Sequence, residues 1–594
     1  YAQVTVQNFI YGGMENTTAT VMNKRMLYDD HMGVTKTQQG LVAHELAHMW
    51  WGDMVTCAEW SHLWLNEGFA TYFQQLYRGY HEGDDAFRYE VDERYRKTIA
   101  KDEKDARPIV VDFYNRKGSK NSANVYTKGQ GVLHMLRFLV GDELFRETIR
   151  VYGEKHKYQV AETSDFMKVV RETTGENMDW FFEQWCYLAG HPKLRVTEYW
   201  DDDNNRLRIT VAQTQEITRL TPLFRLPMDI EITCDEKTEL HRVAIDEASQ
   251  DFYFSLPSRP RMVIVDKGDW TLKTMDHEKS VKTLIYQAKH ADTMSRINAC
   301  RDLARKRPEA EIVETLRGIM MSNEFWGLRR EAAIALGHVN TIESQAALME
   351  GLGAEDARVR LAIAKGMGNL TTDKDVDRVL LDRLRNDYAY QVRAESVKSL
   401  VAMDSPQARK ACLEALKQKS DYTDQVRVAG LRGLVALEAT GNIEEVRRMA
   451  EQGNRRYVRH EAISAYAKLA AASDNPRDRK RAAKNLSAML DDWYRKTRKA
   501  TVAALDTLGE ASAIPALEQL SRTDPVGSIR ARAKKAIERL EAKQTGVASA
   551  EKMRSEIRRL SRQIETLQRD LEALRKGTSE ENKTQFSRKE DGSN

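Results

Sequence analysis

A repeat in the second half of the chain constrains the fold more than any other feature. From about residue 276 onward, an arginine recurs just before a run rich in Ala, Gly and Leu, such as REAAIALGHV. Successive arginines are separated by 33, 31, 33, 34, 32, 39 and 32 residues. Such a period is typical of helix pairs that stack on their neighbours and are stable only together. The repeat therefore predicts an α-solenoid over residues 276–543. The arginines are Arg296, Arg329, Arg360, Arg393, Arg427, Arg459, Arg498 and Arg530.

A histidine motif near the start of the chain limits the chemistry. His44 and His48 are four residues apart in HELAHMWW, so on a helix they project from one face. Eighteen residues separate His48 from a carboxylate, Glu67. Two imidazoles and one carboxylate form a three-ligand zinc site that leaves a fourth position for water. Glu45 lies beside a ligand, where it can take the proton of that water. The alternative, histidines that merely pack on an amphipathic helix, does not account for Glu67, so we expect one Zn²⁺ per chain.

Three segments together resemble a known family. HELAHMWWGDMVT, WLNEGFATYF and the upstream GGMEN occur in this order, as in the gluzincin aminopeptidases of the aminopeptidase-N type. The resemblance covers roughly the first 275 residues, and its motifs are specific jointly rather than singly. It implies a thermolysin-like zinc peptidase domain and hydrolysis of the N-terminal bond of peptides with a free N-terminus. The helical repeats resemble short bacterial HEAT repeats, and the family's N-terminal β-domain is absent from the given sequence.

The same resemblance gives a role to Glu15. By itself Glu15 is only a polar residue after a glycine turn. In the family this carboxylate would hold the α-ammonium group of the substrate through a charge-assisted hydrogen bond. The rest of the expected substrate-binding segment is Gly12, Gly13, Met14 and Asn16.

A tyrosine far along the chain completes the expected catalytic residues. Tyr126 lies in YTKG, 59 residues after Glu67. By its own pattern it is a packing residue before a helix start. The resemblance implies that its phenolic hydrogen stabilises the oxyanion of the transition state. The expected catalytic pair is therefore Glu45 and Tyr126.

Two other functions fit parts of the sequence. A non-catalytic scaffold could combine a peptidase-like fold with repeats that bind a protein partner. A zinc endopeptidase shares the zinc pentapeptide but has no use for Glu15. Cleavage of N-acetylated peptides would distinguish an endopeptidase from an aminopeptidase, and loss of zinc binding would favour the scaffold.

The remaining segments complete a multidomain α+β chain. After a catalytic domain at residues 1–189, short alternating runs predict a small β-sandwich at 190–275. After the solenoid, apolar residues at alternating steps of four and three, from Met553 to Leu574, predict a short coiled coil at 544–576. That helix could pair two copies of the chain. The polar residues 577–594 are expected to be disordered.

Composition excludes several classes of partner. The net charge is only +4 although 31% of residues are charged, so no nucleic-acid partner is expected. No stretch is long and apolar enough to span a membrane. The five cysteines are far apart and odd in number, which favours buried thiols over disulfides. The sequence opens on Tyr1 without a signal-like stretch, so it does not distinguish a cytoplasmic from a periplasmic or secreted protein. Four tryptophans, Trp50, Trp51, Trp60 and Trp64, are expected to pack in the core around the zinc site.

Overall fold

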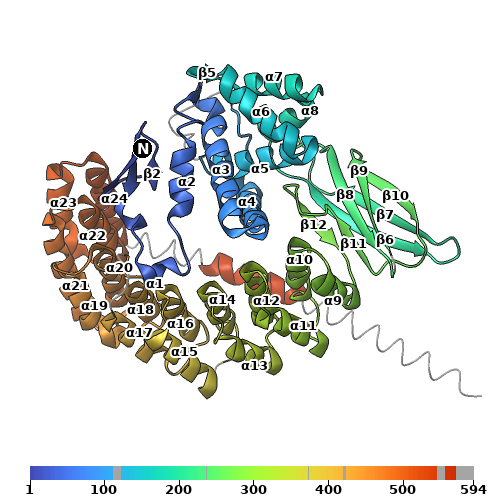
Figure 1. Cartoon of the computed structure of the whole chain (residues 1–594). Coiled ribbons are helices and arrows are strands. Elements are labelled where there is room, and N and C mark those ends of the chain that lie inside the picture. Colours follow the sequence, from blue (N-terminus) through green and yellow to red (C-terminus); the bar gives the residue numbers. More distant parts are fainter. Residues whose placement is uncertain (112–121, 236, 372, 419–422, 545–555, 570–594) are drawn as a thin grey trace, which may run out of the picture. The chain divides into compact units, whose positions relative to one another are not determined.

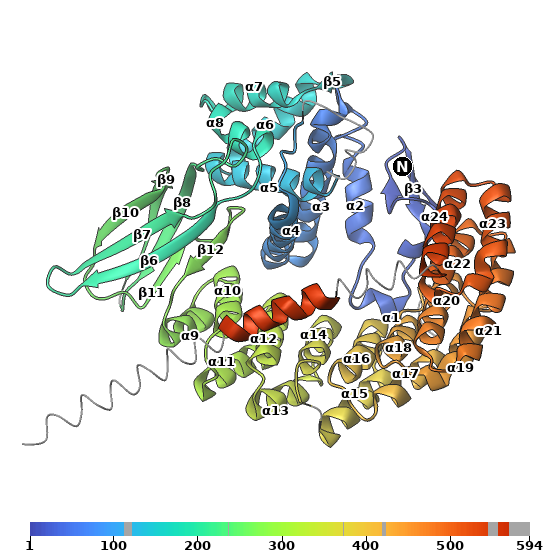
Figure 2. The same ribbon diagram turned by 180° about the vertical axis from the view of Figure 1, so that it is seen from behind.

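The computed structural model describes residues 1–111, 122–235, 237–371, 373–418, 423–544 and 556–569. The chain forms two compact units, Tyr1–Ala429 and Gly430–Asn594 (Figures 1 and 2). The first contains a helical domain with a small sheet, a β-sandwich and the first helix repeats. No described helix has the length and apolar character needed to cross a membrane.

A small sheet opens the first unit. Its strands are β1 (Ala2–Val6), β3 (Ala19–Asn23) and β2 (Gly13–Met14), in that spatial order. β1 runs parallel to β3, and β2 runs antiparallel to it. A second, two-stranded sheet pairs β4 (Val55–Cys57) with β5 (Gln159–Ala161).

Helices make up the rest of this part of the chain. They are α1 (Asp30–Gly33), α2 (Gln39–Ala47), α3 (Trp64–Glu82), α4 (Asp84–Asp105), α5 (Ser122–Val140), α6 (Asp142–Lys155), α7 (Thr163–Thr174) and α8 (Asp179–Phe182), with a π-helical turn at Glu183–Tyr187. α3 lies against α2, α4 and α5 (Figure 1). Its inward side chains Trp64, Phe69 and Tyr72 are fully buried. These three large aromatic rings belong to one hydrophobic core that also includes buried residues of the β-sandwich.

The tryptophan prediction is half right. Trp51 and Trp64 are buried, but Trp50 is 50% exposed and Trp60 is 62% exposed. Trp50 and Trp51 are consecutive, and Trp51 takes the inward direction, where its ring lies 5.1 Å from that of Phe69. Trp60 lies on a short 3-10 turn at the surface. Of the four tryptophans, only Trp51 and Trp64 therefore contribute to the core.

The predicted β-sandwich is confirmed. One sheet has the order β10-β7-β6-β12 and the other β11-β8-β9. β8 alternates buried and half-buried residues along its whole length, as expected for a strand with one face on the core. β12 was not predicted, because its sequence TMDH has no apolar alternation; it pairs in parallel with β6. The strands are β6 (Lys193–Asp201), β7 (Arg206–Gln213), β8 (Leu226–Thr233), β9 (Thr238–Ile245), β10 (Ser249–Ser255), β11 (Met262–Val265) and β12 (Thr274–His277).

The repeats are pairs of antiparallel helices, as predicted. In the first unit they are α9 (Val281–His290), α10 (Thr293–Leu303), α11 (Ala310–Met321), α12 (Trp326–Val339), α13 (Ile342–Gly351), α14 (Ala357–Met367), α15 (Lys374–Asn386), α16 (Tyr390–Ala402) and α17 (Ala408–Lys417). The unit boundary falls within α18 (Gln425–Ala436). The second unit continues with α19 (Ile443–Ala450), α20 (Arg456–Ala472), α21 (Pro476–Ala488), α22 (Arg495–Leu508), α23 (Ile514–Thr523) and α24 (Gly527–Gln544).

The recurring arginine has a similar structural task in each of the described pairs. It lies near the start of the second helix and donates to a carbonyl oxygen at the end of the first helix or in the connection that follows it. Arg329 Nε reaches the Met320 oxygen at 3.0 Å, and Arg459 Nε reaches the Ala450 oxygen at 3.0 Å. The last carbonyls of a helix have no partner within it, so the guanidinium supplies one. Arg296 makes the same bond, and Arg393, Arg427 and Arg530 bond the carbonyl of the residue directly after the first helix. Arg360 instead bonds the Ala354 and Glu355 carbonyls in the loop after α13, and Arg498 bonds those of Asp492 and Trp493, after the 3-10 turn Met489–Asp491.

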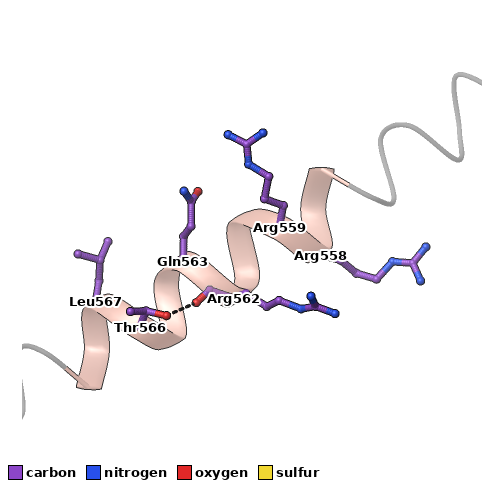
Figure 3. Close-up of a pocket in the computed structure, with 6 residues that line it drawn as sticks. All are labelled: Arg558, Arg559, Arg562, Gln563, Thr566 and Leu567. Carbon is purple, nitrogen blue, oxygen red and sulfur yellow. Dashed lines mark hydrogen bonds between the residues drawn. The ribbon is translucent and has the colours of Figure 1, made fainter. Parts of the chain in front are cut away.

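A separate helix covers residues 556–569. Ile557, Leu560, Ile564 and Leu567 are between 52% and 66% exposed. Figure 3 shows Leu567 projecting from this helix together with the polar side chains around it. The remainder of the predicted coiled coil, and the tail predicted to be disordered, lie outside the described residues, so both stay predictions.

All five cysteine thiols are buried, as expected. Burial raises the pKa of Cys57 to about 11 and that of Cys300 to about 12. These thiols are therefore protonated and unreactive near neutral pH.

Candidate active site

The two histidines of the zinc motif lie at the end of α2. His44 is in its last turn and His48 follows directly after it. Both are buried, with His48 only 1% exposed. His48 Nδ1 lies 2.8 Å from the carbonyl oxygen of Trp51. A carbonyl can only accept, so Nδ1 carries the hydrogen and Nε2 of a neutral His48 has its lone pair free for a metal.

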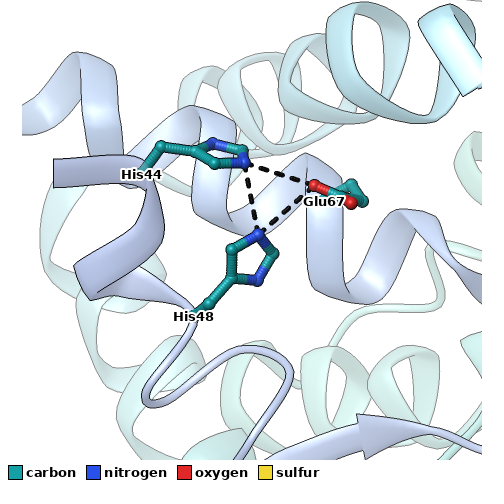
Figure 4. Close-up of side chains that lie close together, drawn as sticks. All are labelled: His44, His48 and Glu67. Carbon is teal, nitrogen blue, oxygen red and sulfur yellow. Dashed lines mark hydrogen bonds and ion pairs between the residues drawn. The ribbon is translucent and has the colours of Figure 1, made fainter. Parts of the chain in front are cut away.

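Glu67, in the first turn of α3, brings its carboxylate to the same point. Figure 4 shows the three side chains converging. The two histidine Nε2 atoms are 3.2 Å apart, and each lies 3.3 Å from Glu67 Oε2. A tetrahedral ion with bonds of about 2.0–2.1 Å separates its ligands by about 3.3 Å. Apart from these two imidazole nitrogens, the buried Glu67 Oε2 has no hydrogen-bond partner among the described residues. The distances, the orphaned oxygen and the donor types all fit zinc.

The second oxygen of Glu67 is held by Tyr126. The tyrosine hydroxyl donates to Glu67 Oε1 at 2.5 Å, and its ring lies 6.0 Å from that of His44, close to parallel. The sequence pattern placed Tyr126 before the start of a helix, but in the structure it lies inside helix α5. In this arrangement the Tyr126 hydroxyl orients Glu67, one of the predicted zinc ligands.

Two glycines allow Tyr126 to reach Glu67. A Cβ atom added to Gly68 would lie 3.0 Å from the Gly129 backbone, and one added to Gly129 would lie 3.1 Å from Gly68 Cα. α3 and α5 therefore cross in direct backbone contact. Since Gly68 is adjacent to Glu67 and Gly129 is one turn from Tyr126, this crossing sets the distance between the two side chains.

The proposed base and the proposed ammonium anchor meet beside the histidines. One carboxylate oxygen each of Glu15 and Glu45 lies within 4.8 Å of the other and of a His48 nitrogen. Glu45 is 4% exposed, and a Cβ atom added to Gly13 would overlap its carboxylate. Only glycine lets strand β2 approach α2 this closely. The sheet thus brings Glu15 to the metal motif although Glu15 precedes His44 by 29 positions in the sequence.

Electrostatics set the protonation states of the proposed metal ligands and of Glu45 in the metal-free protein. Burial would raise the pKa of Glu67, but its hydrogen bonds with His44 and His48 outweigh burial and lower this pKa to about 2. Burial lowers the pKa of His44. An anionic Glu67 and a neutral His44 are ready to bind a cation. For His48, burial lowers the pKa, but the hydrogen bond with Glu67 and the charges of Glu67 and Glu15 outweigh burial and raise it to about 9, so this imidazole must lose a proton when a metal binds. Burial, together with the charges of Glu15 and Glu67, raises the pKa of Glu45 to about 8. A carboxylate tuned in this direction is suited to exchanging a proton near neutral pH.

The remaining residues of the predicted substrate-binding segment make contacts within the small sheet and next to it. Gly12 rests against Leu41 of α2, and Met14 pairs with Val21. Asn16 is exposed, and its carbonyl oxygen accepts from Ala19 N at 3.0 Å in the turn before β3.

Two supports of the site were not predicted. The Trp51 carbonyl orients His48, and the buried Asn66 side chain accepts from Cys57 N at 3.0 Å, tying the segment after α2 to α3. A backbone acceptor leaves no signal in a sequence. Asn66 does stand directly before Glu67, which is the one clue that the sequence offered.

Comparison with known families agrees with this geometry. Residues 1–185 match the description "Peptidase family M1 domain". Residues 281–368, 319–387 and 376–467 match "HEAT repeats". The resemblance to aminopeptidases of the aminopeptidase-N type and the assignment of HEAT-like repeats are thereby confirmed.

Individual relatives each match about a third of the chain. The sequence is 32% identical over 217 residues to tricorn protease-interacting factor F2 of Thermoplasma volcanium, covering 35% of this chain and 27% of that protein. It is 33% identical over 228 residues to aminopeptidase N of Haemonchus contortus, covering 35% and 23%. The matches thus span about a quarter of these relatives. A solved structure, Legionella pneumophila aminopeptidase A in complex with aspartic acid, has the same fold, with a TM-score of 0.61 and 16% identity over 90% of this chain and 70% of that one.

Proposed function

The chain carries a peptidase family M1 domain at residues 1–185, and from that premise we propose that it is a zinc-dependent aminopeptidase. The observation that carries this proposal is the position of Glu15. Its carboxylate lies within 4.8 Å of the Glu45 carboxylate and of His48. An anionic group at that distance from the reacting centre suits a substrate whose first residue bears a free ammonium group.

His44, His48 and Glu67 would hold one zinc ion. When bound, zinc supplies Lewis-acid polarisation of the scissile carbonyl and acidifies a water molecule. The chain's own residues then have separate tasks. Glu45 takes the proton from the attacking water and returns it to the leaving amine. Glu15 binds the α-ammonium group and fixes the register, so that the first peptide bond lies at the site.

Tyr126 acts on the opposite side of the carbonyl. Its hydroxyl, which donates to Glu67 in the free protein, turns to the oxyanion as charge develops there. Burial keeps the pKa of Tyr126 above its ordinary value, so the hydroxyl retains its hydrogen for donation. One preorganised donor of this kind is worth about 3 kcal/mol of transition-state stabilisation.

A panel of fluorogenic aminoacyl amides, each with a free or an acetylated N-terminus, tests the proposal. We expect the zinc-loaded chain to cleave only the free-amine substrates. Glu45→Gln should remove the activity, and Glu15→Gln should raise KM at least tenfold, as expected when a charge-assisted bond is lost. Equal cleavage of acetylated substrates would instead favour a zinc endopeptidase. A chain that binds no zinc and cleaves neither set would favour a scaffold.

The C-terminal helix supports a further proposal about partners. We propose that residues 544–576 pair two copies of the chain. The exposed stripe of Ile557, Leu560, Ile564 and Leu567 recurs at steps of three and four, as a two-stranded coiled coil requires. Sedimentation equilibrium should show a dimer that Ile564→Lys converts to a monomer. A wild-type chain that sediments as a monomer at all concentrations would contradict the pairing.

A further inference from the structure

Helix α1 attaches the N-terminal segment to the helix repeats of the same unit. Met32 on α1 is 3% exposed. Its carbonyl oxygen accepts from Gln391 Nε2 at 3.4 Å, and its sulfur lies 2.8 Å from the same nitrogen. Gln425 Nε2 lies 2.9 Å from the sulfur as well. Met32 is therefore enclosed by residues of α16 and α18.

The neighbouring His31 strengthens this attachment. Its ring stacks on Tyr388, with 4.1 Å between ring centroids, and on Tyr390 at 4.9 Å. His31 Nδ1 donates to the carbonyl oxygen of Tyr388 at 2.7 Å. Stacking and a hydrogen bond together restrict the ring to one orientation. Two consecutive side chains thus fasten α1 to the repeats.

A short path leads from α1 back to Glu15. β3 ends at Asn23, one 3-10 turn (Lys24–Met26) before the segment that enters α1. β3 pairs with β2, where Met14 faces Val21, and Glu15 follows Met14 directly. Any displacement of β3 is therefore passed to Glu15 through ladder hydrogen bonds rather than through a flexible loop.

The side chain of Asn23 ties the end of β3 to the segment that precedes β2. It is 6% exposed, and its Nδ2 atom donates to the carbonyl oxygens of Phe9 at 2.8 Å and Tyr11 at 3.0 Å. These bonds hold the segment before Gly12 against the end of β3. All five residues of β1, on the other edge, are exposed. Support for the sheet thus comes from α2, against β2, and through β3 from α1.

We propose that the repeats position the ammonium anchor: α1, held on α16 and α18, fixes β3 and β2 so that Glu15 faces the metal motif. His31 and Met32 are positioning residues, acting through Glu15. The inference rests on the proposed aminopeptidase function for its kinetic consequence, but its structural part is independent of that function.

Hydrogen–deuterium exchange tests the structural part in the full chain. Met32→Ala should speed amide exchange in residues 13–23, while α2 and α3 keep the wild-type rates. Gln391→Ala, which removes the contact from the repeat side, should have the same effect. Val34→Ala, a truncation at an exposed position two residues on, is the matched control and should change nothing. Unchanged exchange of residues 13–23 in both Met32→Ala and Gln391→Ala would overturn the proposal.

Kinetics test the consequence for substrate binding. For free-amine aminoacyl amides we expect Met32→Ala and Gln391→Ala to raise KM about tenfold, with kcat within about twofold of wild type, because a small displacement weakens an oriented contact. Zinc content should equal that of wild type. A fall in kcat at constant KM would overturn the positioning role, since it would mean damage to the zinc centre. If the wild-type chain cleaves none of these substrates, the proposed function fails, while the exchange experiment still decides the structural part.

Discussion

The hydrogen bond from Tyr126 to Glu67 gives one side chain two tasks. It holds one oxygen of a predicted zinc ligand in the resting protein. In the mechanism that we propose, the same hydroxyl donates to the oxyanion during the reaction. Residues that orient metal ligands typically change metal affinity by about 10- to 100-fold when they are removed. A residue that served the oxyanion alone would leave metal affinity unchanged.

Tyr126→Phe therefore separates the two tasks. We expect the zinc dissociation constant to rise about tenfold and kcat to fall about 100-fold. Competition with a fluorescent chelator measures the first, and turnover at saturating zinc measures the second. Tyr80→Phe, on α3 and 90% exposed, is the matched control. Wild-type zinc affinity in Tyr126→Phe would show that the bond to Glu67 is not a support of the ligand.

Residues on one helix could be paired from the sequence, whereas residues on different helices could be paired only where a known motif spacing links them. His44 and His48 follow from helical periodicity alone. Glu67 could be added because its spacing from the motif is characteristic of zinc peptidases. Nothing in the spacing predicts that Tyr126, on another helix, contacts Glu67; only the family resemblance singled it out. The Trp51 carbonyl had no signal at all, because every residue carries one.

At the scale of helices, the crossing of α3 and α5 is the geometric basis of the site. Gly129→Ala would place a methyl group 3.1 Å from Gly68 Cα, so the helices would have to separate by a few tenths of an ångström. We expect kcat/KM to fall about tenfold and the free energy of unfolding to fall by about 1–3 kcal/mol. Gly318→Ala is the matched control, since nothing lies within 4 Å of its added Cβ. A fully active Gly129→Ala would mean that the crossing does not set the site.

The repeated arginine makes a second prediction at this scale. Arg459 donates to the Ala450 carbonyl and to Asp492, whose side chain is 4% exposed. Arg459→Met leaves that buried carboxylate without its cationic partner, with the Tyr494 N–H still donating to it, so we expect stability to fall by about 3 kcal/mol. Urea unfolding followed by circular dichroism measures this. Arg448→Met, at an exposed position of α19, should unfold like wild type. Equal unfolding curves for the two variants would contradict the capping role.

Within the first unit, α4 is joined to the repeats by a buried ionic cluster. Arg301 of α10 pairs with Asp92 of α4 at 2.8 Å and with Glu331 of α12 at 3.0 Å. Tyr89 of α4 donates to Glu331 at 2.6 Å. The Glu331 side chain is 4% exposed, so its charge depends on these partners. The contact fixes the peptidase domain to the first repeats.

Arg301→Met should therefore destabilise the first unit without altering its chemistry. We expect a loss of about 3–5 kcal/mol and unchanged zinc affinity, measured by thermal unfolding and by metal titration. Arg305→Met, whose side chain is 76% exposed, should leave the unfolding temperature unchanged. Loss of zinc binding in folded Arg301→Met would show that the cluster supports the site itself.

The sequence predicted the order of the parts better than their attachments. Repeat period, strand alternation and the zinc motif each depend on residues close in sequence, so all three were visible. The contacts of Arg301 with Asp92 and of Met32 with Gln391 join residues 209 and 359 positions apart. Charged and polar side chains of this kind also occur on solvated faces, so their burial could not be read from composition.

Zinc titration of the metal-free chain tests the central claim most directly. The account predicts that one equivalent of zinc binds per chain and that hydrolysis of a free-amine aminoacyl amide rises in proportion to bound zinc. Glu67→Gln should bind zinc far more weakly, while Glu45→Gln should bind one equivalent and remain inactive. Activity that does not depend on zinc, or a Glu67→Gln chain that binds and works like wild type, would contradict the assignment of His44, His48 and Glu67 as the metal site.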